Sequence, residues 1–269
     1  MTPSPPAPAL QLEFACATDT GLARNNNEDS VVFDEPASLA VLADGMGGYN
    51  AGEVASSMAT SLISTEYGRW LAEAGEQAGD DDVCRAMERH IVQANRAIFD
   101  AANTQPQCSG MGTTLVAAAF RGAQMIVAHV GDSRAYRWRG GVLTQITRDH
   151  SLLQEQLDAG LITPAQAAVS NHRNLVTRAV GVESTVEVET HVHTTQAGDC
   201  LLLCSDGLSD MIPDDRIAAV LAAHEALPAA AQALIHAANK AGGRDNISVI
   251  LVRASGAGQT ARAWWPFKR

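Results

Sequence analysis

The chain has 269 residues, 46% of them hydrophobic and 18% charged, a composition that supports a large buried core and excludes a disordered chain. Its 30 Asp and Glu residues against 19 Lys and Arg residues give a formal net charge of −11, which argues against a nucleic-acid-binding protein. The net negative charge does not exclude a phosphorylated substrate, because the positive charge of a local metal site can outweigh the electrostatic field of the whole protein.

The start of the chain and its cysteines indicate the cellular compartment of the protein. Residues 1–10 are rich in proline and lack the charged and apolar regions of a secretory signal, so we expect a flexible N-terminal tail. No apolar run approaches about 18 residues, so no transmembrane segment is expected. Five cysteines, an odd number in a long chain, fit a reducing cytosol better than a disulfide framework. We therefore expect a cytoplasmic protein.

The predicted elements form runs of strands with helices between them. Apolar runs rich in β-branched residues predict strands at residues 30–33, 39–43, 113–120, 125–130, 135–139, 186–193, 200–204 and 247–252. Apolar residues at helical spacing predict helices at 51–74, 80–102 and 229–241. This order favours an α+β protein built in layers over a strict βαβ alternation.

Residues 151–174 interrupt the strand pattern. Leucines four residues apart predict a helix over 151–159. Thr163-Pro164-Ala165-Gln166 then has the residues of a capping box, with proline at the first helical position, and predicts a second short helix. We expect the two helices to form a small flap within one domain over 11–253.

The end of the chain, residues 254–269, has a different composition. Its first residues, 254–259, are small and polar and predict a flexible linker. The last residues, Trp264-Trp265-Pro266-Phe267-Lys268-Arg269, join aromatic and basic side chains. This tail either docks on a partner or a membrane surface, or is idle or packed on the protein itself.

Four aspartates stand at the ends of predicted strands: Asp44, Asp132, Asp206 and Asp245. A carboxylate at the end of a core strand loses solvation unless a positive charge compensates it. Oxygen ligands clustered without His or Cys are typical of Mg²⁺ or Mn²⁺ sites and not of zinc. The alternative is four independent turn aspartates, since Asp-Gly is a common turn pair. The repeated junction with an apolar strand favours the metal site.

A polar segment near the start offers further charged groups. Arg24, Glu28 and Asp29 lie just before the strand predicted at 30–33, and arginine is suited to two-point binding of phosphate. The alternative is a solvated loop with a surface ion pair. Because the chain has no Walker loop and no phosphatase loop with a cysteine or aspartate nucleophile, the attacking group is expected to be water activated by metal.

These features occur as motifs in one order along the chain. They are Asp19-Thr20-Gly21 with Arg24 and Asn27-Glu28-Asp29, Ala43-Asp44-Gly45-Met46-Gly47-Gly48 with Gly52-Glu53, Gly110-Met111-Gly112-Thr113-Thr114, His129-Val130-Gly131-Asp132-Ser133-Arg134, Thr147-Arg148-Asp149-His150-Ser151, Asn174-Leu175-Val176-Thr177-Arg178-Ala179-Val180-Gly181, Cys204-Ser205-Asp206-Gly207-Leu208 and Gly243-Arg244-Asp245-Asn246. With these motifs, the sequence resembles the bacterial branch of the PPM, or PP2C-type, metal-dependent serine/threonine protein phosphatases.

The resemblance implies a four-layer α-β-β-α sandwich of two antiparallel sheets flanked by helix pairs, with a small helical flap. It also implies a centre with two Mn²⁺ or Mg²⁺ ions. Asp44 would bridge the two ions, and the Gly45 carbonyl would bind one of them. Asp206 and Asp245 would hold the other ion.

The resemblance also assigns residues around this pair of ions. Glu28 and Asp29 would hold metal-bound waters, and Asp132 with Asp206 matches a third, weaker metal site. Arg24 would bind the substrate phosphate. Met46 departs from the pattern, because animal relatives carry at this position a histidine proposed as the general acid. His150 is a candidate for that role, and a structural role is the alternative.

The function implied is hydrolysis of phosphoserine and phosphothreonine in proteins, with Arg24, Asp44, Asp206 and Asp245 as the catalytic residues. The substrates would be phosphorylated proteins, including a bacterial serine/threonine kinase whose phosphorylation reactions the enzyme reverses. We expect a monomer. One alternative is a phosphatase-like binding or regulatory module with weak catalysis. Another is a phosphatase for small metabolites or for phosphorylated sigma-factor antagonists.

Overall fold

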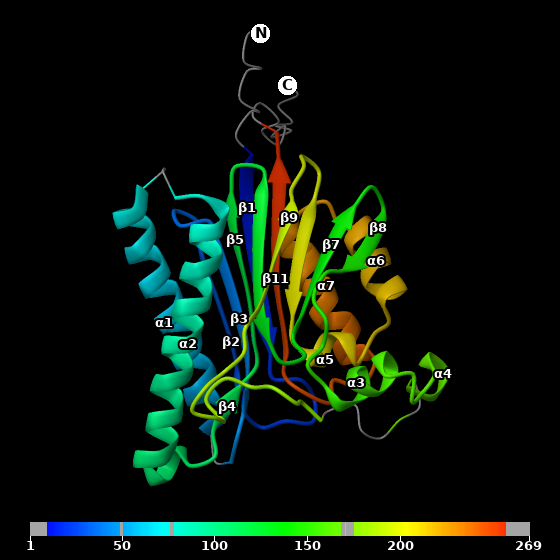
Figure 1. The fold of residues 1–269 in the computed structure, drawn as a ribbon. Coiled ribbons are helices and arrows are strands. Elements are labelled where there is room, and N and C mark those ends of the chain that lie inside the picture. Colours follow the sequence, from blue (N-terminus) through cyan, green and yellow to red (C-terminus); the bar gives the residue numbers. More distant parts are fainter. Residues whose placement is uncertain (1–9, 49–50, 76–77, 168–169, 171–174, 257–269) are drawn as a thin grey trace, which may run out of the picture.

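Two antiparallel β-sheets form the centre of the computed structural model, which describes residues 10–48, 51–75, 78–167, 170 and 175–256 (Figure 1). The first sheet has the order β1-β11-β10-β7-β8, with β1 Gln11–Asp19, β11 Ile247–Ser255, β10 Cys200–Cys204, β7 Arg134–Arg139 and β8 Val142–Gln145. The second sheet has the order β2-β3-β5-β6-β9, with β2 Asp29–Asp34, β3 Leu39–Met46, β5 Leu115–Arg121, β6 Gln124–Val130 and β9 Glu189–Thr194. The short strand β4, Gly112–Thr113, pairs with the end of β3.

Helices cover the outer face of each sheet (Figure 1). The second sheet is covered by α1, Ala51–Ala74, and α2, Asp80–Thr104, and a short 3₁₀ helix, η2, follows at Pro106–Cys108. The first sheet is covered by α6, Asp214–Ala223, and α7, Leu227–Lys240. Three short helices lie near one end of the sandwich: α3 Leu152–Asp158, α4 Pro164–Ala167 and α5 Asp206–Ser209.

The strand sequences explain these layers. In β3, Leu39 and Val41 pack under α1 and α2, whereas Ala40 and Leu42 point between the two sheets. Because side chains alternate along a strand, a run that is apolar at every position is buried on both faces. β11 has the same pattern, with Leu251 against the helices and Ile250 between the sheets. The expected four-layer α-β-β-α sandwich is confirmed.

Several boundaries differ from the prediction. β1 was not predicted, because it contains no valine or isoleucine, yet it pairs with β11 along its whole length. The strand predicted at 113–120 divides into β4 and β5, and β9 begins three residues later than expected. The short polar strand β8 and the helices α5 and α6 were also not predicted.

The expected linker is partly wrong. Ala254 and Ser255 belong to β11, where they pair with Leu12 and Gln11, so the strand runs two residues past the expected domain end. Residues 1–9, 168–169, 171–174 and 257–269 of the expected tails and flap lie outside the described residues. In the part of the chain that is described, no helix has the length and apolar character needed to cross a membrane.

Candidate active site

The four strand-end aspartates meet at one end of the sandwich. Asp44 lies near the end of β3, and Asp206 begins α5 just after β10. Asp245 lies two residues before β11, and Asp132 lies between β6 and β7. All four line a cavity of about 220 Å³. The structure therefore brings together carboxylates that are up to 201 residues apart in the chain, since the positions run from 44 to 245.

The other predicted site residues gather at the same place. Arg24, Glu28 and Gly45 line this cavity with the aspartates. Asp29 lies behind it, in β2, where it pairs in register with Asp44 and accepts a hydrogen bond of 2.9 Å from the Ser205 hydroxyl. Every residue predicted to bind metal or phosphate is thus at the cavity or directly beside it.

The backbone around Asp44 is held from two sides. The Thr113 hydroxyl and the Thr114 amide both donate to the Asp44 carbonyl, at 2.8 and 2.9 Å. The Gly45 amide donates to the Glu28 carbonyl at 3.1 Å. A side chain at Gly45 would collide with the carbonyl oxygens of Gly52 and Glu28, so only glycine allows this close approach. The end of β3 is therefore fixed in position.

Asn246 holds the loop that carries Arg24. Its side-chain amide donates to the carbonyls of Thr20 and Asn26 at 3.0 and 2.8 Å, and its oxygen accepts from the Glu28 amide at 2.8 Å. This supporting role was not predicted, although Asn246 directly follows Asp245 in a motif. Arg24 itself donates to Asp245 at 2.7 Å, and its side chain is 53% exposed. The guanidinium thus lies at the rim of the cavity, open to a ligand.

The carboxylates of the cluster resist ionisation together. Burial raises the pKa of Asp44 well above its ordinary value, and the charges of Asp29, Asp206 and Asp132 raise it further. Burial, and next the charge of Asp132, raise the pKa of Asp206 in the same way. Burial also raises the pKa of Asp29 and of Asp132 to about 6 each. The cluster is therefore short of positive charge.

Two carboxylate oxygens show the same shortage. Asp206 Oδ1 and Asp29 Oδ1 are buried and have no hydrogen-bond partner in the described structure. Among the described residues that line the cavity, Arg24 alone is basic. Buried carboxylates of this kind are paired or coordinate metals, and an all-oxygen donor set suits Mn²⁺ or Mg²⁺. The residues present therefore fit a site for divalent cations.

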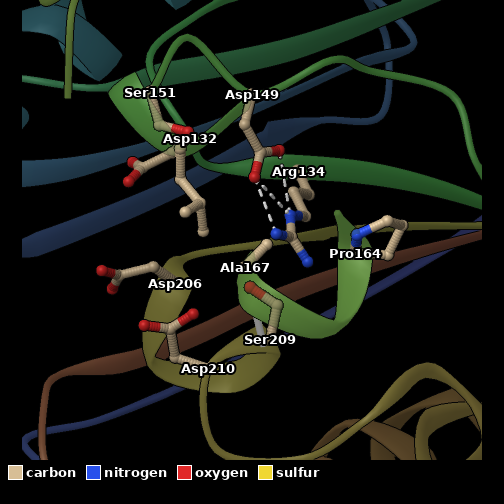
Figure 2. Close-up of a pocket in the computed structure, with 10 residues that line it drawn as sticks. Asp132, Arg134, Asp149, Ser151, Pro164, Ala167, Asp206, Ser209 and Asp210 are labelled. Carbon is tan, nitrogen blue, oxygen red and sulfur yellow. Dashed lines mark hydrogen bonds and ion pairs between the residues drawn. The ribbon is translucent and has the colours of Figure 1, made fainter. Parts of the chain in front are cut away.

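A second cavity of about 320 Å³ lies beside the first, and Asp132 and Asp206 line both (Figure 2). Asp210 adds a third carboxylate on the same wall, and the prediction missed it, although its position one helical turn after Asp206 was the available signal. Across the cavity Arg134 forms a two-point ion pair with Asp149, at 2.7 Å for the shortest contact (Figure 2).

His150 lies apart from these cavities. It is 6% exposed, its Nδ1 accepts from the Gly131 amide at 3.2 Å, and its Nε2 lies 3.2 Å from the Glu189 carboxylate. Because both ring nitrogens are occupied inside the protein, the geometry favours the structural role over the general acid. His129, His150 and Glu189 could offer three ligands to a metal, but the two rings stack with only 22° between their planes, so their lone pairs do not converge.

The comparisons with known proteins agree with this geometry. The family model of protein phosphatase 2C matches residues 23–251. A serine/threonine phosphatase, Stp, of Listeria innocua is 40% identical over 238 residues, which cover 87% of this chain and 93% of the relative. The crystal structure of the catalytic domain of PstP in complex with two manganese ions is 37% identical, with a TM-score of 0.80, and the match covers 91% of this chain and 99% of that one.

A further solved structure, Stp1 from Staphylococcus aureus, is 31% identical with a TM-score of 0.84, and the match covers 95% of this chain and all of that one. The chain therefore belongs to the protein phosphatase 2C family. The resemblance found in the sequence is confirmed, and so is the class of enzyme, a metal-dependent protein phosphatase.

Proposed function

We propose that this phosphatase hydrolyses phosphoserine and phosphothreonine in proteins at a centre with two Mn²⁺ or Mg²⁺ ions. We also propose that it reverses the phosphorylation carried out by a bacterial serine/threonine kinase. The observation that carries the proposal is the group of buried, uncompensated carboxylates around one cavity, with Arg24 at the rim. The relative from Listeria, named a serine/threonine phosphatase, and the structure of PstP with two manganese ions support it.

The proposed ligands are those that the family resemblance implies, and they line the cavity or lie beside it. Asp44 and the Gly45 carbonyl, with Asp206 and Asp245, would hold two ions. Glu28 and Asp29 would act through waters, and Asp132 with Asp206 would hold a third, weaker ion. Bound there, the ions would neutralise phosphate charge and activate the attacking water.

The chain itself contributes binding and orientation. Arg24 is exposed enough to leave Asp245 and to bind two phosphate oxygens, and its planar guanidinium fixes the orientation of the group. Met46 lines the cavity but has no proton to donate, so the leaving oxygen is not protonated from this position. Asn246 and Thr114 keep the phosphate-binding loop and the end of β3 in register.

The proposed partners are phosphorylated proteins, including a kinase, and the proposed state is a monomer in the cytoplasm. The free thiols support a reducing compartment, because all five cysteines are unpaired, among them the buried Cys108, Cys200 and Cys204.

The test is turnover of p-nitrophenyl phosphate and of phosphoserine and phosphothreonine peptides, with a panel of phosphorylated metabolites as the comparison. We expect activity that requires added Mn²⁺ or Mg²⁺, disappears with a chelator and favours the peptides. Full activity in metal-free buffer would overturn the metal centre. Turnover of metabolites alone would favour a metabolite phosphatase, and no turnover with either metal would favour the binding module.

A further inference from the structure

A third cavity, of about 370 Å³, adjoins the active site, and the two share Met46 and Val176 as a common wall. We call it the Met46–Val182 cavity, after two residues that line it. Its other apolar side chains are Ala179 and Val186. A ligand bound at the carboxylate cluster therefore has a second cavity directly next to it, in which five of the ten lining residues are apolar.

Val182 is exposed although it is apolar, and its backbone is firmly held. Val182 is 53% exposed. Asn95, which is 1% exposed on α2, accepts from the Gly181 amide at 2.6 Å and donates to the Glu183 carbonyl at 3.0 Å. A buried side chain thus uses both its polar groups to hold the residues on either side of Val182. The exposed valine is pre-organised in position.

The strand β4 connects Val182 to the end of β3. Val180 forms two backbone hydrogen bonds with Thr113, of 2.8 and 2.9 Å. A Cβ atom added at Gly112 would lie 2.6 Å from Val182 Cγ2, so Val182 packs directly over this glycine. Gly112 in turn pairs with Met46. Met46 and Val182, two apolar residues that line the cavity, therefore both lie against Gly112 of β4.

The charged residues of the cavity define which occupant fits. Arg178 and Glu187 form an ion pair at 3.2 Å, so their charges compensate each other. Glu183 is the remaining charged residue among the described residues that line the cavity. An acidic occupant is disfavoured by this carboxylate, and the apolar side chains of Met46, Val182 and their apolar neighbours in the lining favour an apolar one.

We propose that the Met46–Val182 cavity is a substrate subsite that takes an apolar side chain close to the phosphoresidue of a protein substrate. This inference rests on the proposed function, and it names the substrate class more closely, because a small phosphometabolite has no flanking side chain to place there. Val182 and Met46 then determine which phosphoproteins are preferred.

The test uses phosphothreonine peptides in an alanine background, with one leucine placed in turn at each of three positions on either side of the phosphothreonine. In the unmodified protein we expect leucine at one position to raise kcat/KM about tenfold over alanine, as filling an apolar pocket does. Val182→Asp should bring this leucine-to-alanine ratio close to one. Val142→Asp, on the exposed surface of β8, is the matched control and should keep the ratio.

The ratio separates the possible outcomes, because each enzyme is compared with itself on two peptides. No preference for leucine at any position, or a preference that survives in Val182→Asp, would overturn the subsite. If Val182→Asp does not fold, Val182→Thr keeps the shape and should still reduce the ratio several-fold. Turnover of p-nitrophenyl phosphate with equal rates on all peptides would refute the subsite alone, whereas no turnover of any phosphate ester would also refute the proposed function.

Discussion

The two ends of strand β10 carry aspartates in opposite environments. Asp199 immediately precedes the strand and is 5% exposed. It accepts two hydrogen bonds of 2.6 Å from Arg139 and one of 2.8 Å from the Gln196 amide. Asp206 follows the strand at its other end, and its Oδ1 is buried with no partner in the described structure.

This difference between Asp199 and Asp206 indicates the role of the unpaired Asp206 carboxylate. At the Asp199 end the chain supplies an arginine, so the buried charge is compensated within the fold. At the Asp206 end the neighbours are Asp132, Asp245 and Asp210, which raise its pKa in addition to the effect of burial. Because the same strand shows that this fold can provide a cation for a buried aspartate, we infer that the Asp206 end receives its cations from solution.

The largest effect is expected when a charge is removed at the Asp206 end. Asp44→Asn or Asp206→Asn should each lower kcat about a thousandfold or more, because metal ions contribute several kcal/mol of charge stabilisation. The metal-free variants should stay folded and be at least as stable as the unmodified chain, since one repelling charge is gone. The measurements are kcat at saturating Mn²⁺ and thermal unfolding in chelator. A kcat near that of the unmodified enzyme in Asp44→Asn would refute the assignment.

A smaller loss is expected at the rim. Arg24→Ala should lower kcat/KM about 10- to 150-fold, because a charge-assisted hydrogen bond contributes about 1.5–3 kcal/mol. Arg24→Lys should recover only part, since an ammonium cannot form the two-point contact. Steady-state kinetics on one phosphopeptide, with Mn²⁺ affinity measured in parallel, check this. A defect confined to Mn²⁺ binding would show that Arg24 acts through Asp245 and not on phosphate.

The opposite end of β10 should respond in stability and not in metal dependence. Arg139→Met leaves Asp199 without its main partner and should lower the free energy of unfolding by about 2 kcal/mol, less than for a fully buried pair because the Arg139 side chain is 30% exposed. Denaturant unfolding in chelator measures this loss. The Mn²⁺ concentration needed for activity should not change, and a large change in it would mean that the two ends are coupled.

Much of this contrast could be predicted from the sequence. The aspartates at the Asp206 end follow or precede runs that are mostly apolar, so both their place at a sheet end and their burial could be predicted. The pairing of Asp199 could not, because Arg139 lies 60 residues away and nothing local marks it as the partner. The supporting role of Asn246 was missed for the same reason, since its partners at Thr20 and Asn26 are joined to it only in three dimensions.

The pH dependence of the free energy of unfolding should also reveal the uncompensated carboxylates of the cluster. The pKa of Asp132 rises to about 6 in the folded chain, above its ordinary value near 4, chiefly through burial. A raised carboxyl pKa gives stability that is complete below about pH 4 and is lost as the pH rises through about 6. In chelator, the unmodified protein should therefore lose more stability than Asp132→Asn between pH 4 and pH 7. Equal slopes of the unfolding midpoint against pH would contradict this.

The smallest effect is expected at His150, where two roles make different predictions. Gly131, at φ +104°, forms the turn that presents Asp132, and His150 holds this turn through Nδ1 and through its own amide, which donates to the Gly131 carbonyl at 2.9 Å. Since the Gly131 amide donates to Nδ1, the ring proton lies on Nε2 and is donated to Glu189. His150 is then a positioning residue for Asp132.

Two variants of His150 separate positioning from proton donation. In His150→Asn the amide oxygen can replace Nδ1 and keep the bond to Gly131, whereas His150→Gln reaches towards Glu189 and loses that bond. Because a neutral hydrogen bond contributes about 0.5–1.5 kcal/mol, His150→Gln should raise the Mn²⁺ concentration needed for half-maximal activity about 2- to 12-fold, and His150→Asn should change it less. The pH–rate profile should keep its shape in both. If His150 were instead the general acid, both variants would lower kcat alike, and the profile would lose its limb at high pH, because the activity would no longer depend on a protonated imidazole.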